Sequence, residues 1–484
     1  MLFNSYIFIL VFLPAALLGF FGLVRFKRWE LAGLFVTGLS LWFCAYFDPY
    51  FALILTGSIL INHLFVRLMD RYGEHRKAFL VTGIIFNVLL LFCFKYIDFT
   101  IGTVNVLTGS SIPLSGIVMP LGISFYTFQQ IAYLVDYHNG EVRDHSLRKY
   151  FFFVSFFPKL ASGPIVRHSE LMPQLSDRSR LCFDHAYFSK GIYRFSVGLA
   201  KKVLLADTLS KAVDHGYSAI GTLSSAESWL VALLYSLQLY FDFSGYCDMA
   251  LGIANCFHLD LPENFNLPYF ADSITDFWKR WHITLTGFLT RYVYIPLGGN
   301  RKGKLRTFVN ILIVYLISGL WHGADWSFVM WGVLHGAACC LHRLWGGLWN
   351  RLPAFIKIPV TFIYVTICWV FFRAKDLGDA FLLLGRMFGR IHGGISSGLT
   401  ECFDILELTY LEDHIGLFGS ICQRGPSLNM IVIILAAVSA VVIEKLFSGK
   451  EFRPTAGRAV IAVILLSWSV LSLSGVSVFL YFNF

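Results

Sequence analysis

The chain has 484 residues, of which 56% are hydrophobic and only 14% are charged. Soluble domains carry about 25% charged residues, so this composition excludes a soluble globule, a disordered chain and a disulfide-stapled secreted domain. It leaves a membrane protein that crosses the bilayer several times. The formal net charge of +9 comes from Lys and Arg in short loops between apolar runs, which indicates membrane topology and contact with anionic lipid headgroups rather than a nucleic-acid partner.

Ten apolar stretches approach the roughly 20 residues that a helix needs to cross a membrane. They cover residues 6–24, 31–47, 51–66, 78–94, 112–134, 191–208, 227–254, 357–373, 429–447 and 459–481. The loops after the first, third and fifth stretches are basic, whereas the loops between them carry almost no Lys or Arg. Because basic loops stay in the cytoplasm, we expect both termini to lie outside it. The expected fold class is all-α, a polytopic bundle of membrane helices.

Two apolar stretches do not fit simple crossings. Pro158, with a further Gly and Pro, interrupts the run 150–166, which we interpret as a re-entrant or interfacial segment. The run Phe308–Arg343 has basic residues on both flanks, which favours a helical hairpin with His322 at its midpoint. His322 lies about 21 Å of helix beyond Phe308, so we expect it deep in the membrane whether the segment returns or crosses.

Residues 375–428 are predicted to form an extracytoplasmic loop. It contains Cys402 and Cys422, which could form a disulfide in an oxidising exterior, although two free thiols fit equally well. The sequence shows no soluble domain, internal repeat or low-complexity tract. We therefore expect one integral membrane domain over residues 1–484, with its motifs in a core over 112–345.

His322 is the strongest candidate for chemistry, because ionisable side chains in a bilayer are costly and usually functional. Apolar surroundings disfavour the imidazolium, so the neutral ring could act as a base. Gly323 permits close approach of a ligand or backbone, and Trp321 and Trp326 could shield the site from water. A core histidine that bridges two helices is an equally good interpretation.

His282 is the second candidate. It lies in residues 272–288, which we predict to be an amphipathic helix on the cytoplasmic side, with Lys279 and Arg280 away from its aromatic face. A base beside a basic patch suits a phosphorylated cytoplasmic ligand. Periodicity alone favours an interfacial helix whose basic residues bind lipid headgroups.

Two more sets of polar residues lie inside apolar stretches. Asp242 and Asp248 could orient a base, bind a cation or, for Asp242, contact a substrate; a polar cluster that holds helices together is equally plausible. His335, Cys339 and His342 share one helical face, as metal ligands can, but no fourth ligand follows at a known spacing and core packing is favoured. No nucleophile elbow, phosphate-binding loop or dinucleotide fingerprint occurs.

Several motifs occur in an order that resembles the membrane-bound O-acyltransferase family. They are MPLGISFYTFQQIAYLVDYHNGE at 119–141, SFFPKLASGPIVR at 155–167, NFNLPYF at 264–270, DFWKRWHITL at 276–285, YVYIPLGGNRKG at 292–303 and SGLWHGADW at 318–326. The similarity covers residues 40–345, and within the family it is nearest to the bacterial alginate O-acetyltransferases.

This resemblance implies a bundle around a central funnel that reaches a buried histidine. His322 matches the family's catalytic histidine and His282 its second characteristic histidine. The family transfers an acyl group from a cytoplasmic thioester donor to an acceptor hydroxyl, and its polysaccharide-acetylating members pass the group to a separate extracytoplasmic transferase. We therefore expect an enzyme of the bacterial inner membrane that uses acetyl-CoA as co-substrate, with no bound cofactor or metal, to acetylate a polysaccharide such as alginate or peptidoglycan.

The expected donor side carries four cations that could bind the phosphates of CoA, with Trp321 and Asp242 as further substrate contacts. The four are Lys279, Arg280, Arg301 and Lys302. His322 would act as a general base, and a covalent acyl-histidine is an alternative. Two other functions stay open: a transporter or flippase for a glycan or lipid-linked intermediate, which should show repeated halves that are not found, and a family relative that acylates protein or lipid.

Overall fold

The computed structural model describes residues 1–142, 144–405, 410, 414, 426–447, 449, 451–473, 479 and 480. These residues form helices joined by turns and irregular segments, and no strand occurs among them. The predicted all-α class is therefore confirmed. Arg143, Cys422 and most of residues 406–425 fall outside the described part, so the proposed pairing of Cys402 with Cys422 stays a prediction.

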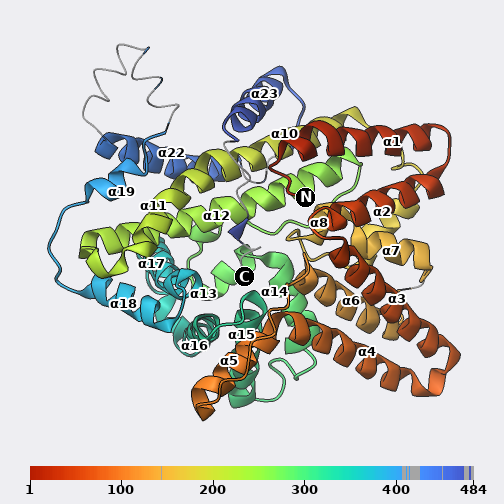
Figure 1. Cartoon of the computed structure of the whole chain (residues 1–484), viewed down its shortest axis with the longest axis horizontal. Coiled ribbons are helices and arrows are strands. Elements are labelled where there is room, and N and C mark those ends of the chain that lie inside the picture. The colour runs from red at the N-terminus through yellow and green to blue at the C-terminus, as the bar shows by residue number, and fades with distance from the viewer. Residues whose placement is uncertain are drawn as a thin grey trace.

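The first four α-helices lie next to one another on the right of Figure 1, where short turns join them into antiparallel pairs. Their starts follow local sequence: Asp48 caps the third helix by accepting a hydrogen bond from the Tyr50 N–H at 2.9 Å, and Pro49 occupies its first turn. The elements are η1 (Phe8–Phe12), α1 (Leu13–Arg25), α2 (Trp29–Ala45), α3 (Pro49–Arg71), η2 (Gly73–His75), α4 (Arg76–Leu91), η3 (Phe92–Tyr96) and α5 (Ile97–Thr108).

The longest helix, α12 (Ser225–Cys256), runs through the core and is buried along most of its length. It packs closely on α10, because an added Cβ at Gly198 would lie only 2.6 Å from the Gly245 carbonyl oxygen. The other elements between α5 and α12 are α6 (Ile123–His138), α7 (Leu147–Ser155), α8 (Phe157–Leu160), α9 (His168–Ser176), α10 (His185–Ala200), η4 (Lys201–Ala206), α11 (Asp207–Ser218) and η5 (Ile220–Thr222).

After α12 come short helices near the centre of Figure 1, followed by a long hairpin and the C-terminal helices. Helices α15 and α16 form the hairpin that the sequence predicts, and α13 packs against α14, α16 and α17. The elements are η6 (Pro268–Phe270), α13 (Ile274–Arg280), α14 (Ile283–Leu289), η7 (Thr290–Tyr294), α15 (Lys304–His322), α16 (Trp326–Trp349), α17 (Ala354–Arg373), α18 (Leu377–Phe388), α19 (Ser397–Glu401), α22 (Pro426–Phe447) and α23 (Ala456–Leu471).

Six helical stretches in the described part are long and apolar enough to cross a membrane. They are Phe8–Arg25, Pro49–Arg71, Gly73–Thr108, Lys304–His322, Ala354–Arg373 and Ser427–Leu446, and two shorter apolar helices are Trp29–Ala45 and Ala456–Leu471. The predicted stretches 191–208 and 227–254 are helical but are not among the six. The polytopic membrane architecture is confirmed, while the expectation of ten simple crossings is not.

Two predicted boundaries are wrong. The stretch 78–94 belongs to a helical run that continues through the π-helical turn η3 to Thr108. Lys95, the basic residue expected in the loop after this stretch, instead lies within the run. The first half of the stretch 112–134 is not helical, because α5 ends at Gly109 in a left-handed conformation and two prolines follow before α6 begins at Ile123.

Two segments outside the predicted crossings also have defined structure. The run 150–166 is broken as predicted: α7 ends at Ser155, α8 spans four residues, and irregular backbone follows. The segment 375–428, predicted as an extracytoplasmic loop, begins with the helix α18. The indole of Trp229 on α12 donates a hydrogen bond to the Met387 carbonyl of α18 at 2.9 Å and so ties the two helices together.

Candidate active site

The two candidate histidines come together although 40 positions separate them in sequence. The centroids of the His282 and His322 rings lie 6.2 Å apart, with the rings tilted by 56°. His282 is fully buried and His322 is 3% exposed. The structure therefore brings together two buried imidazoles from different helical segments.

His282 lies at a break between two short helices, so the prediction of one amphipathic helix over 272–288 is wrong. α13 ends at Arg280, Trp281 is extended, and His282 adopts a left-handed conformation with φ 45° before α14 begins. The interfacial-helix interpretation also fails, because Trp281 and His282 are buried inside the protein. Left-handed backbone is uncommon for a non-glycine residue and often marks a functional position.

Asn264 holds this break in place. Its backbone carbonyl accepts a hydrogen bond from the Ile283 N–H at 3.0 Å, and its side-chain oxygen accepts from the Thr284 N–H at 3.2 Å and the Thr284 hydroxyl at 3.0 Å. The same oxygen lies 3.0 Å from Nδ1 of His282. Because that oxygen can only accept, Nδ1 of His282 must donate, and Nε2 is the nitrogen that carries the lone pair.

The protonation state of His282 follows from its surroundings. Burial lowers its pKa to about 3, and His282 lies outside the six candidate spans. The His282 ring packs nearly perpendicular to the Phe243 ring of α12, with ring centroids 4.8 Å apart. His282 is thus a neutral imidazole with a fixed tautomer at neutral pH.

His322 is the last residue of α15, at the tip of the α15–α16 hairpin. The two helices touch through glycines: an added Cβ at Gly319 would lie 2.3 Å from the Phe328 carbonyl oxygen, and one at Gly332 would lie 2.4 Å from the Tyr315 carbonyl oxygen. At the turn itself, a Cβ at Gly323 would overlap the Phe328 ring. These small residues allow the tight turn that presents His322.

Aromatic rings surround His322. Ring centroids lie 4.9 Å away for Trp321 and 5.2 Å away for both Trp331 and Phe372. Trp321 therefore lies at the site as expected, whereas Trp326 is half exposed and packs on Phe99. Trp331 takes the place that the sequence analysis gave to Trp326, because it lies on the face of α16 that turns toward α15.

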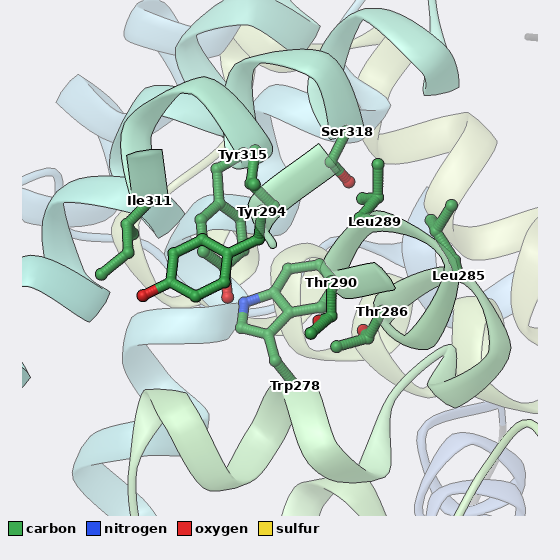
Figure 2. A pocket seen from close by; sticks show the side chains of 10 residues that line it. Trp278, Leu285, Thr286, Leu289, Thr290, Tyr294, Ile311, Tyr315 and Ser318 are labelled. Atoms are coloured by element: carbon green, nitrogen blue, oxygen red, sulfur yellow. The ribbon is translucent and has the colours of Figure 1, made fainter. Parts of the chain in front are cut away.

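A cavity of about 200 Å³ lies between α13, α14, η7 and α15, the segments on either side of His282 and before His322 (Figure 2). Trp278 of α13 forms one wall and faces residues of α14, η7 and α15 across the cavity. Ser318 lies in the lining one helical turn before His322, about 6 Å along the axis of α15. The lining residues are Trp278, Leu285, Thr286, Leu289, Thr290, Tyr294, Ile311, Val314, Tyr315 and Ser318.

Three of the four predicted phosphate-binding cations are exposed: Lys279, Arg301 and Lys302. Lys279 follows the cavity residue Trp278 directly. Arg301 and Lys302 lie on the loop before α15, which folds back on the cavity wall, since an added Cβ at Gly299 would lie 3.6 Å from the Tyr294 ring. Arg280 is only partly exposed and is paired with Asp276 at 2.8 Å.

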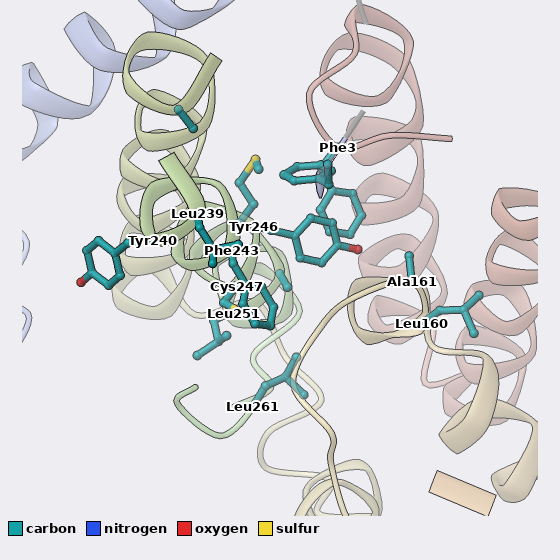
Figure 3. Packing of buried hydrophobic residues seen from close by; sticks show 14 of the residues in the cluster. Phe3, Leu160, Ala161, Leu239, Tyr240, Phe243, Tyr246, Cys247, Leu251 and Leu261 are labelled. Carbon is teal, nitrogen blue, oxygen red and sulfur yellow. The ribbon is translucent and has the colours of Figure 1, made fainter. Parts of the chain in front are cut away.

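Asp242 is held by contacts with η4 and with residue 480. Figure 3 shows the buried face of α12 on which Tyr246 stacks against Phe3, with ring centroids 5.0 Å apart. The Asp242 carboxylate instead pairs with Lys202 at 2.6 Å and accepts a hydrogen bond from the Leu480 N–H at 3.0 Å. These contacts correspond to the alternative interpretation, a polar cluster that holds segments together.

Asp248, further along α12, also forms ion pairs with neighbouring segments. It pairs with Arg194 of α10 at 3.0 Å and with Lys201 at 2.7 Å, and Lys201 also reaches Glu444 of α22 at 3.1 Å. A partly buried carboxylate with such partners is a structural tie between helices.

Each of the three residues His335, Cys339 and His342 contacts a different partner. Nδ1 of His335 accepts from the Trp278 indole at 3.2 Å, the Cys339 thiol lies 3.2 Å from the Tyr315 hydroxyl, and His342 lies 3.1 Å from the Thr275 hydroxyl. In the described ranges, no three His, Cys, Asp or Glu residues are grouped to hold a metal ion.

Comparison with known proteins assigns the class. Residues 139–377 match the membrane-bound O-acyltransferase family, MBOAT. The peptidoglycan O-acetyltransferase of Helicobacter pylori is 36% identical over 100% of this chain and 98% of its own length. This chain therefore belongs to the membrane-bound O-acyltransferase family and is an acyltransferase.

Two further bacterial proteins are also similar to this chain. The probable alginate O-acetylase AlgI of Pseudomonas aeruginosa is 36% identical over 80% of this chain and 75% of its own length. The teichoic acid D-alanyltransferase of Bacillus subtilis is 25% identical over 54% of this chain and 71% of its own length. The resemblance stated from the motifs is confirmed.

Proposed function

We propose that this protein is an O-acetyltransferase of the bacterial cytoplasmic membrane that moves an acetyl group from acetyl-CoA toward a cell-surface glycan. The observation that carries the proposal is the buried pair of His282 and His322, 6.2 Å apart, at the positions that the motifs assign to the family's two histidines. Membership of an acyltransferase family disfavours the transporter or flippase alternative.

His322 acts as the general base in this proposal. It removes the proton from the acceptor hydroxyl while the hydroxyl oxygen attacks the thioester carbonyl. The carbon–sulfur bond then breaks, and the proton passes to the leaving thiolate, so that an ester and a free thiol are the products. The aromatic rings of Trp321, Trp331 and Phe372 keep water from the thioester.

The donor enters through the cavity beside Trp278. The pantetheine arm of CoA is a thin chain with amide groups, and the Ser318 hydroxyl in the lining has no hydrogen-bond partner among the described residues. Lys279, Arg301 and Lys302 are exposed and would hold the phosphates. Arg280 has Asp276 as its partner and contributes less.

Peptidoglycan is the acceptor polymer that we favour. The similarity to a protein named peptidoglycan O-acetyltransferase runs through the whole chain, including the part after residue 375, whereas the similarity to the alginate acetylases covers 80% of it. Alginate is the second candidate. In either case a separate extracytoplasmic transferase completes the delivery, and both termini of this protein lie on that outer side.

The test is the acetyl content of surface polymers from cells that carry His322→Ala in place of the unchanged protein. We expect O-acetyl groups to fall to the level of cells that lack the protein, while the variant is still made and inserted. His75→Ala is the matched control, because His75 is exposed on a short turn far from α15 in sequence, and it should leave acetylation unchanged. Normal acetylation with His322→Ala would disprove the proposal.

A further inference from the structure

The last turn of α15 has an unusual set of hydrogen-bond donors. A helix leaves its final four carbonyl groups without donors from the helix itself. In α15 these carbonyls belong to Gly319, Leu320, Trp321 and His322. The Gly323 N–H donates to the first at 3.2 Å, and the Tyr96 hydroxyl donates to the second at 2.7 Å.

Lys95 supplies the donors for the remaining two. Its ammonium donates to the Trp321 carbonyl at 2.6 Å and to the His322 carbonyl at 3.0 Å. Every one of the last four carbonyls thus has a donor. A cation at the C-terminus of a helix is also stabilised by the helix dipole.

The two donors come from one π-helical turn, η3. In a regular helix, side chains of consecutive residues point about 100° apart and do not converge on one target. The π-helical turn at Phe92–Tyr96 widens the helix locally, and π-bulges of this kind are frequent at functional sites. It lets Lys95 and Tyr96 reach consecutive carbonyls at the end of another helix.

We propose that Lys95 and Tyr96 are positioning residues that fix the end of α15 and thereby the place of the His322 ring. The inference rests on the proposed role of His322. The His322 side chain begins one bond from the backbone that Lys95 holds, and a displacement of about 1 Å at a catalytic group can cost roughly 100-fold in rate. Without its donors, the last turn of α15 would unwind or shift, and the imidazole with it.

The test measures acetyl transfer from acetyl-CoA by the purified full-length protein in lipid nanodiscs, using the acceptor on which the unchanged protein is active. We expect Lys95→Met to lower kcat about 100-fold while KM for acetyl-CoA stays within about twofold. Lys95→Arg keeps a cation with donors and should recover most of the loss. Tyr96→Phe removes one hydroxyl and should lower kcat about 10-fold. Lys77→Met, an exposed lysine of the same helical run, is the matched control and should leave kcat unchanged.

Two further readouts separate positioning from general stability. Amide hydrogen exchange in residues 318–326 should be faster in Lys95→Met, while exchange in α12 stays unchanged. In addition, Lys95→Met combined with His322→Ala should be no less active than His322→Ala alone, because Lys95 acts through His322.

The outcomes distinguish this inference from the proposed function. An inactive His322→Ala with full kcat in Lys95→Met overturns the positioning role and leaves the proposed function standing. An unchanged kcat with a raised KM in Lys95→Met also overturns it, because Lys95 would then bind the donor. A fully active His322→Ala overturns the proposed function whatever Lys95 does. If Lys95→Met fails to fold, Tyr96→Phe decides: a lowered kcat at constant KM supports the inference, and an unchanged kcat overturns it.

Discussion

A single asparagine decides the chemical state of the second histidine. Thr284 offers Asn264 a backbone N–H, which can only donate, so the Asn264 atom that receives it must be the oxygen. The same oxygen then fixes the proton of His282 on Nδ1. Asn264 was visible in the sequence only as the start of the motif at 264–270. Its role depends on residues 264 and 284 meeting in space, which no local pattern encodes.

This environment predicts a pH dependence of stability. Burial lowers the pKa of His282 from 6.5 to about 3, so the unfolded chain binds a proton at a higher pH than the folded protein. Above pH 6.5 the group has no effect. As the pH falls from 6.5 toward 3, it reduces the free energy of unfolding by about 1.4 kcal/mol per pH unit.

We expect His282→Gln to make the decline of the unfolding midpoint between pH 6.5 and 4 shallower, measured by thermal unfolding in detergent. Gln keeps an amide donor for Asn264 but does not titrate. His75→Gln, which changes an exposed histidine, should leave the slope as it is. Equal slopes for His282→Gln and the unchanged protein would show that His282 is not held neutral by burial.

Among the helices, sequence patterns located the apolar stretches but did not predict where every helix begins, ends or breaks. The hairpin around His322 was predictable because basic flanks and a glycine-rich turn are local features. The long helical run Gly73–Thr108 was not predictable. A lysine between two apolar stretches is typical of a loop, and only the contact of Lys95 with α15 explains why it lies within a helix. The break at His282 was hidden for a similar reason: the aromatic spacing fits one helix, and only the contacts of Asn264 favour the kink.

The close contact between α15 and α16 predicts the effect of enlarging a glycine at their interface. Gly319→Ala would place a Cβ 2.3 Å from the Phe328 carbonyl oxygen, so the helices must separate. We expect a loss of about 1–3 kcal/mol of stability and a clear loss of transfer activity, since His322 lies one turn further on. Thermal unfolding and the acetyl-transfer assay measure both effects.

Gly346→Ala on α16 is the control for that variant. No atom lies within 4 Å of the added Cβ, and replacing a glycine in a helix by alanine stabilises it by about 0.5–1 kcal/mol. The control should therefore be as active as the unchanged protein and slightly more stable. Equal stability of Gly319→Ala and the unchanged protein would contradict the close packing.

The whole molecule contains two kinds of helices with different roles: apolar helices long enough to cross the membrane, and short helices that position the site. Apolar helices that can cross the membrane surround a core in which α12 is buried and tied to α10 and α22 through Asp248, Lys201 and Glu444. Short helices with irregular junctions then bring His282 to the hairpin tip. The composition predicted a bundle of membrane helices. The contacts inside the bundle could not be predicted, because they join residues far apart in sequence, such as Lys95 and Trp321.

We expect a thioester donor to reach His322 from the side of Trp278. The most direct measurement is a structure of the full-length protein with a non-transferable acetyl-CoA analogue in which a methylene replaces the sulfur. We predict the analogue's carbonyl carbon within about 4 Å of the His322 ring and its chain in the cavity beside Trp278. Its phosphates should lie at Lys279, Arg301 and Lys302. An analogue bound elsewhere, with its carbonyl separated from His322 by the aromatic wall, would contradict the account.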